Sequence, residues 1–129
     1  MKAALINAMV VGSGGFLGAL ARYGLSGLVH RLLPFATFPY GTLAVNLLGC
    51  FGIGVMTGLT ESRLLFGPEF RRFALIGLLG GFTTFSTFGF ETFSMIRADE
   101  YFRAAASVGS HLVLGLVLVW LGYALSAHR

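Results

Sequence analysis

Four long stretches without a charged side chain constrain this sequence most. They cover residues 3–21, 32–60, 73–90 and 104–128, and they are 19, 29, 18 and 25 residues long. A transmembrane helix needs about 20 predominantly apolar residues. Charged residues make up 11% of the 129-residue chain, whereas an ordinary soluble domain has roughly 25%. We therefore predict an integral membrane protein, and we exclude a soluble monomer, a disordered chain and a secreted disulfide scaffold.

The predicted fold is all-α, because the apolar stretches are continuous and do not alternate as barrel strands do. Pro34, Pro39 and the pair Gly67-Pro68 mark the breaks between stretches. The expected single domain, residues 1–129, has four transmembrane helices at about residues 4–29, 40–61, 71–96 and 102–126. The first stretch also loosely fits a cleaved signal peptide, but three further spans favour a signal anchor.

Basic residues divide almost evenly between the two sides of the membrane. In a four-span arrangement, one side has five basic residues and the other three: Lys2, Arg63, Arg71, Arg72 and Arg129 against Arg31, Arg97 and Arg103. A difference of two is a weak orientation signal. It leaves open insertion in both orientations and insertion in one, with both termini inside. In so apolar a chain, the net charge of +4 favours membrane orientation over nucleic-acid binding.

Glycine is frequent within the predicted spans. Three pairs lie four residues apart, namely Gly14–Gly18, Gly54–Gly58 and Gly77–Gly81. Each pair makes a flat patch on one helix face, through which two helix backbones can approach closely. Ordinary tight packing explains any one pair. Together the pairs predict a dense bundle with little internal volume, so a pathway between subunits and an oligomer are favoured.

The third span contains the most informative run, residues 80–88, with two adjacent glycines followed by hydroxyl and phenylalanine residues. This composition is poor for a continuous helix, and we expect a break near Gly80 to Thr83. Irregular backbone at membrane depth persists only where it is buried or lines a cavity. Carbonyls freed by a break could bind a cation.

Beyond the expected break, helical spacing places Thr84, Thr87 and Glu91 on one face. Phe85 and Phe88 are neighbours on another face. Aromatic packing and hydroxyls bonded to preceding carbonyls would explain the same pattern. Glu91 has three possible roles: proton carrier, cation site or partner of an arginine.

Other polar residues within the spans also have two readings each. Arg22 either extends to the headgroups or attracts anions to a vestibule. Asn46 either bonds a neighbouring helix or donates its amide to a passing anion. Ser107, Ser110 and His111 form a small polar cluster in the fourth span. His111 is either a packing residue or a group that titrates near neutral pH.

The chemistry of this set is not that of an enzyme. The sequence shows no nucleophile with a base, no metal-ligand cluster and no phosphate-binding glycine motif. Hydroxyls, amides and the positive edges of aromatic rings are donors that suit a small anion. The residues therefore favour a narrow anion route, without choosing the anion.

Three motifs carry a resemblance to a known family. They are Gly-Xaa-Xaa-Gly-Ala-Leu-Ala-Arg ending at Arg22, Gly-Thr-Leu-Ala-Val-Asn ending at Asn46, and residues 80–88. With the length and the four spans, they make the chain resemble the Fluc (CrcB) family of fluoride channels. The resemblance implies a multi-pass plasma-membrane protein that passively exports fluoride and so confers fluoride resistance. It also implies an antiparallel, dual-topology homodimer with two pores along its interface.

The resemblance also implies a role for each matched residue. The edges of the Phe85 and Phe88 rings would contact fluoride, and Asn46 would line the pore. Pore-side hydroxyls, or support for Asn46, would come from Thr42, Ser86 and Thr87. Arg22 would lie at the vestibule, and the polar route would include Glu91, Ser110 and His111. The carbonyls of Gly80 and Thr83 from both subunits would bind one structural sodium ion as a cofactor.

The fourth span departs from the family pattern. Family members often have tyrosine where this chain has Ser107, and serine where it has His111. The histidine would make conduction sensitive to pH.

Two alternative functions remain open at this point. A proton-coupled small multidrug exporter shares the length and four spans, but it needs a carboxylate in its first span, and residues 3–21 have none. An accessory membrane protein without transport would be an apolar bundle with few polar side chains inside its spans. The cluster of hydroxyl and phenylalanine residues argues against this function.

Overall fold

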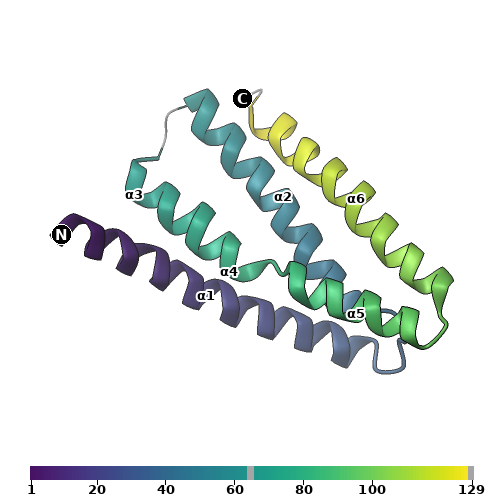
Figure 1. Cartoon of the computed structure of the whole chain (residues 1–129). Coiled ribbons are helices and arrows are strands. Elements are labelled where there is room, and N and C mark those ends of the chain that lie inside the picture. The colour runs from purple at the N-terminus through teal and green to yellow at the C-terminus, as the bar shows by residue number, and fades with distance from the viewer. Residues whose placement is uncertain (64–65, 128–129) are drawn as a thin grey trace.

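The computed structural model describes residues 1–63 and 66–127, and these residues form helices and no strands. The elements are α1 (Lys2–Leu32), α2 (Tyr40–Arg63), α3 (Pro68–Arg71), the π-helix η1 (Arg72–Leu79), α4 (Gly80–Phe82), α5 (Phe85–Arg97) and α6 (Tyr101–Ala127). Segments α3 to α5 follow one another along one line (Figure 1). With them, the chain has four helical segments long and apolar enough to cross a membrane. The predicted all-helical architecture with four such segments is confirmed. That residues 1–129 form a single domain stays a prediction.

Short connections join the helices. Pro34 and Pro39 lie between α1 and α2, and Pro68 occupies the first turn of α3, where its missing amide hydrogen costs nothing. Asp99 follows α5 with a φ of 59°, a left-handed conformation that short polar side chains tolerate. The Tyr101 hydroxyl donates a hydrogen bond to Asp99 Oδ1 at 3.0 Å. As a result, α6 runs back beside α2, and the last described turn of α6 lies at the same end of the bundle as the first turn of α1 (Figure 1).

Two helix pairs make up most of the packing. Helix α2 packs along α6, and α1 packs along η1 and α4. The second contact depends on glycine. A Cβ atom on Gly77 would lie 2.6 Å from the Val11 carbonyl oxygen and 3.0 Å from Gly14 Cα. Because such contacts exclude any side chain, glycine at this position lets the two backbones approach closely.

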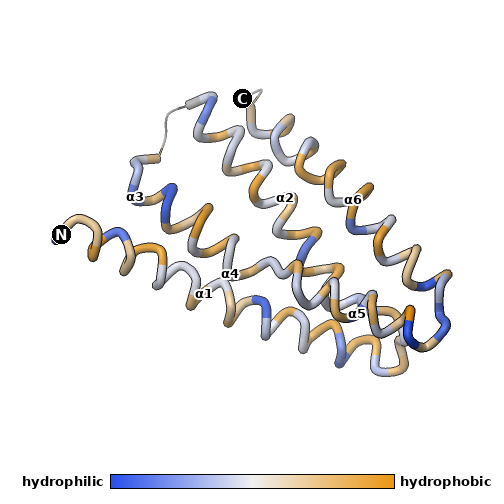
Figure 2. Tube along the Cα trace, in the orientation of Figure 1, coloured by the Kyte–Doolittle hydropathy of each residue, from blue (hydrophilic) through white to orange (hydrophobic). Residues whose placement is uncertain are grey.

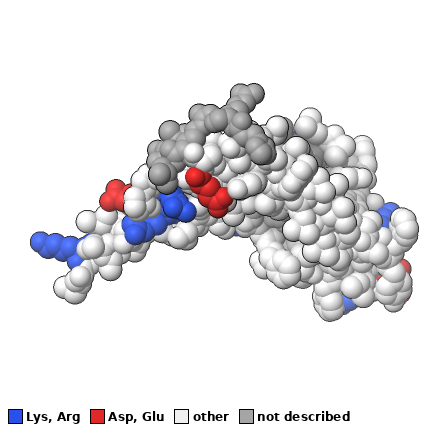
Figure 3. Space-filling view, turned by 90° about the horizontal axis from the view of Figure 1, so that it is seen from above, with Lys and Arg blue, Asp and Glu red and all other residues white. Residues whose placement is uncertain are grey.

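The exterior of the bundle is apolar. Large hydrophobic side chains on every long helix are exposed, and Figure 2 shows hydrophobic residues along the lengths of all four segments. On the face seen in Figure 3, charged side chains gather in the left part of the view and at its right edge, and the described surface between these two groups is uncharged. This distribution suits lipid or a second protein surface, because a charged group at membrane depth is costly.

Candidate functional site

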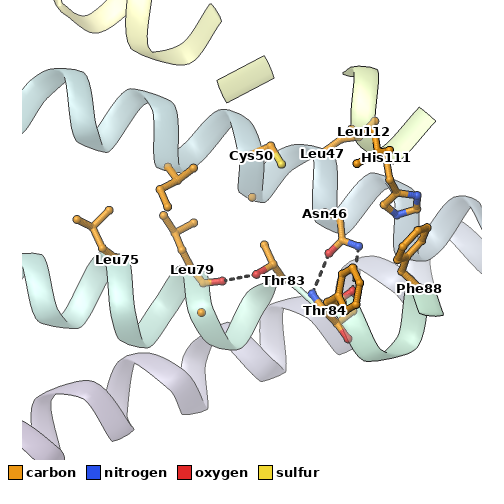
Figure 4. A pocket seen from close by; sticks show the side chains of 14 residues that line it. Asn46, Leu47, Cys50, Leu75, Leu79, Thr83, Thr84, Phe88, His111 and Leu112 are labelled. Carbon is orange, nitrogen blue, oxygen red and sulfur yellow. Dashed lines mark hydrogen bonds between the residues drawn. The ribbon is translucent and has the colours of Figure 1, made fainter. Parts of the chain in front are cut away.

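The site is built around two residues that leave helical geometry. Thr83 and Thr84 are extended, with φ and ψ of −81° and 158° and of −149° and 112°. In a continuous helix, the Thr84 amide would donate to the Gly80 carbonyl. Here it donates instead to Asn46 Oδ1 at 2.8 Å, and Asn46 Nδ2 donates to the Thr84 carbonyl at 3.0 Å (Figure 4). A side chain of α2 therefore satisfies the backbone of this interruption.

Thr84 also caps α5. Its Oγ1 accepts a hydrogen bond from the Thr87 amide at 3.2 Å, which is the usual role of a threonine at a helix N-cap. The Thr87 amide would otherwise donate to the Thr83 carbonyl. The side chain of Arg22 approaches that carbonyl instead, with Nη1 at 3.4 Å from the oxygen. The carbonyls of Gly80 and Thr83 have therefore both lost their usual helical donors to side chains.

A first cavity of about 410 Å³ opens beside Asn46 and contains both predicted phenylalanines. The ring centroids of Phe85 and Phe88 are 5.5 Å apart, and the planes are tilted by 56°. Phe85 is 83% exposed in the single chain. His111 lines the same cavity, and its ring centroid lies 4.3 Å from that of Phe88 (Figure 4).

A second cavity, of about 520 Å³, lies on the α1 side of the interruption. It is lined by Arg22, His30, Arg31, Thr42 and Thr87 among other residues. Thr84 lines both cavities, so its pair of bonds with Asn46 lies at their common wall. Two arginines and several hydroxyls give the second cavity a character suited to anions.

Thr42 and Glu91 connect α2 to α5. The buried Thr42 hydroxyl donates to Glu91 Oε1 at 2.7 Å. In α6, the Ser110 hydroxyl donates to the Ala106 carbonyl, and Ser110 lines neither cavity. Ser86 is exposed, and its Oγ lies 3.5 Å from Thr84 Oγ1.

The structure thus brings together most of the predicted site residues, but it divides them between two cavities. Asn46, Gly80, Thr83, Phe85, Phe88 and His111 line the first cavity, and Arg22, Thr42 and Thr87 line the second. Thr84 was not among the predicted site residues, although its backbone amide and carbonyl hold Asn46. A threonine just before a predicted helix is an N-cap signal that would have drawn attention to it.

The fold and the site define a small multi-pass helical membrane protein with hydrogen-bond donors and phenylalanine rings gathered at an interruption of one span. The model of the family described as CrcB-like protein, Camphor Resistance (CrcB), matches residues 9–123. The chain belongs to this CrcB family. In a bacterium, such a protein is located in the plasma membrane.

Similar proteins align with this chain over most of their lengths. A protein from Nitratidesulfovibrio vulgaris (strain Miyazaki F) is 46% identical over 114 residues, which cover 88% of this chain and 91% of the relative. One from Methylobacillus flagellatus is 44% identical and covers 94% of both. One from Nitrosococcus oceani is 49% identical and covers 84% of this chain and 86% of the relative. Each is named fluoride-specific ion channel FluC.

Proposed function

We propose that this protein is a passive, fluoride-selective ion channel that exports cytoplasmic fluoride and so confers fluoride resistance. Membership of the CrcB family and the names of its relatives support this function. They give no support to a multidrug exporter, an accessory protein or an enzyme. The structural observation that carries the proposal is the position of Phe85 and Phe88 in one cavity with Asn46.

The donors of the site suit a strongly hydrated anion. Asn46 has two amide hydrogens, and the bond to the Thr84 carbonyl uses one of them. The other stays available to fluoride in the first cavity. Phenylalanine edges carry positive potential, so Phe85 and Phe88 would add weak contacts beside the amide. Several modest contacts favour conduction, because an ion held in one tight cage would not leave.

In this proposal, fluoride approaches through the second cavity. Arg22 and Arg31 line that cavity and would concentrate anions there. The hydroxyls of Thr42, Thr87 and Ser86 would replace part of the hydration shell, with Glu91, Ser110 and His111 as further polar groups of the route. The wall formed by Asn46 and Thr84 then separates the vestibule from the phenylalanine cavity.

The working unit that we propose is an antiparallel homodimer with dual topology. Three features support it: the exposed apolar exterior, the weak charge bias and the exposure of Phe85 at the phenylalanine cavity. Packing of a second copy against this face would bury Phe85 and complete a lined path in each subunit. Cysteine cross-linking across Phe85, together with reporters fused to either terminus, tests both features. Exclusive insertion in one orientation would exclude the antiparallel dimer.

A structural sodium ion fits the same arrangement. The Gly80 and Thr83 carbonyls lack their usual helical donors, and Gly80 is exposed. A carbonyl oxygen has two lone pairs, so the approach of Arg22 leaves one free on Thr83. Two oxygens are too few for a hard cation, and a second copy would double them. The bound ion would supply positive charge that holds the two interrupted spans together.

Fluoride efflux from liposomes that contain the purified protein tests the proposed function. We expect rapid fluoride release, read with a fluoride electrode, and little chloride release under the same gradient. A folded, reconstituted protein that releases no fluoride would exclude the channel function. Transport of organic cations driven by a pH gradient would indicate the exporter instead.

A further inference from the structure

Four buried polar atoms on α5 and α6 have no hydrogen-bond partner among the described residues. They are Glu91 Oε2, Thr92 Oγ1, Ser107 Oγ and His111 Nε2. Ser107 has 0% of its surface exposed. A buried polar atom without a partner is rare in folded proteins, and it commonly marks a place for water or an ion. In an apolar chain, such a group requires a functional explanation.

The hydrogen bond of His111 determines which of its nitrogens is free. Nδ1 lies 2.9 Å from the Ser107 carbonyl oxygen. Because a carbonyl only accepts, Nδ1 carries the hydrogen. In a neutral ring, Nε2 therefore has no hydrogen and presents a lone pair. Protonation of Nε2 would turn it into a charged N–H donor without disturbing the bond at Nδ1.

The His111 ring lies where this change would affect fluoride. It lines the phenylalanine cavity, and its centroid is 4.3 Å from that of Phe88 (Figure 4). We propose that His111 is a proton-controlled fluoride donor: its neutral Nε2 repels fluoride, and its protonated Nε2 attracts it. Fluoride conduction then increases as the pH falls. This inference rests on the proposed channel function.

Titratable and charged groups lie around His111 on the helices of the bundle. Glu91 of α5 lies close enough for its charge to interact with His111, and also with His30 of α1. From α2, the Cys50 thiol lines the same cavity. On α6 itself, Arg103 forms an ion pair with Glu100, with Nη1 2.8 Å from Oε1.

Arg22 of α1 also faces this part of the chain, but it lines the second cavity. When Glu91 is ionised, a neutral His111 leaves a net negative charge beside the route. A protonated His111 balances that charge.

Fluoride flux as a function of pH tests the inference. Liposomes with the wild-type channel and with His111→Gln are compared at a series of pH values from about 8 to about 6. Protein-free liposomes measure permeation by hydrogen fluoride, which is subtracted. We expect wild-type flux to rise severalfold on acidification. His111→Gln should show no rise, because its amide carries N–H donors at every pH. His30→Asn should keep the rise.

The outcomes separate this inference from the proposed function. Wild-type flux that does not change with pH overturns the control by His111 but keeps the channel, whereas no flux at any pH overturns the channel function. Glu91→Gln distinguishes the carboxylate from the imidazole. If Glu91→Gln abolishes the rise and His111→Gln keeps it, the carboxylate is the switch and the inference is wrong.

A second measurement does not need an active His111 variant. Binding linkage is reciprocal, so fluoride that prefers the protonated ring must raise the fraction of protonated ring. In ¹⁵N-histidine NMR, a protein with His30 and His128 replaced by asparagine reports His111 alone. We expect fluoride, but not chloride, to shift this signal toward imidazolium at constant pH. A signal that fluoride leaves unchanged overturns the inference.

Discussion

Asn46 and Thr84 hold each other through two hydrogen bonds, one to the backbone amide and one to the backbone carbonyl of the threonine. A side chain of α2 thereby replaces the helical partners that this backbone would otherwise have. The same pair lies at the wall between the two cavities. Asn46 therefore stabilises the backbone at Thr84, and it is also a candidate hydrogen-bond donor to fluoride.

Replacement of Asn46 by alanine should remove both bonds. Two buried backbone groups would lose their partners, at a cost of about 1–3 kcal/mol each in the free energy of unfolding. We expect a lower thermal midpoint in detergent and loss of fluoride flux. Leu47→Ala, which changes a neighbour that lines the same cavity, is the control for lost volume. Equal midpoints for Asn46→Ala and Leu47→Ala would contradict the structural role.

Replacement of Phe85 or Phe88 by isoleucine should greatly reduce fluoride flux, because isoleucine has no positively polarised ring edge. The variants should still elute at the size of the wild-type protein. Phe90→Ile is the matched control, since Phe90 lies on the same helix, is 70% exposed and lines neither cavity. Wild-type flux in a folded Phe85 or Phe88 variant would exclude the aromatic contacts.

Thr42→Val should leave both oxygens of Glu91 without a side-chain partner. Oε1 loses the 2.7 Å bond from Thr42, and Oε2 has no partner already. The expected loss is about 1–3 kcal/mol of stability, measured by thermal unfolding, with reduced flux. Thr42→Ser keeps the hydroxyl and should behave like the wild type. If valine and serine have the same effect, volume and not the hydrogen bond matters here.

Gly14→Ala should disrupt the contact between α1 and η1. The added methyl would meet the backbones of Phe73, Gly77 and Leu78, with the amide nitrogen of Leu78 at 2.9 Å. We expect poor expression or aggregation on size-exclusion chromatography. Gly12→Ala is the control two residues away, because nothing lies within 4 Å of its added methyl. A stable Gly14→Ala protein would show that α1 can move away from η1.

Removal of sodium tests the proposed ion. With N-methylglucamine as the only cation, the Gly80 and Thr83 carbonyls would have no metal ion to bind. We expect flux to fall and the proposed dimer to dissociate more readily, and readdition of sodium should reverse both effects. Unchanged flux and unchanged size after exhaustive exchange would exclude a structural sodium ion.

Much of the architecture could be predicted from local composition. Uncharged stretches of membrane-spanning length indicate apolar helices wherever they occur, because unsatisfied backbone in lipid leaves few other folds. The spacing of Phe85 and Phe88 likewise made them neighbours within one helix. Both inferences depend on residues that are close in the chain.

The tertiary structure decided how residues far apart in the chain meet. Helical spacing could place Thr84 and Thr87 on one face. It could not show that the Asn46 side chain forms hydrogen bonds with both the backbone amide and the backbone carbonyl of Thr84. Nor could it show that Thr42 bonds to Glu91 across two helices. These pairings depend on the rotation and depth of one helix against another, which glycine contacts such as Gly14 with Gly77 establish. The sequence alone therefore determined a helical membrane protein and its candidate residues, and packing decided which cavity each residue lines.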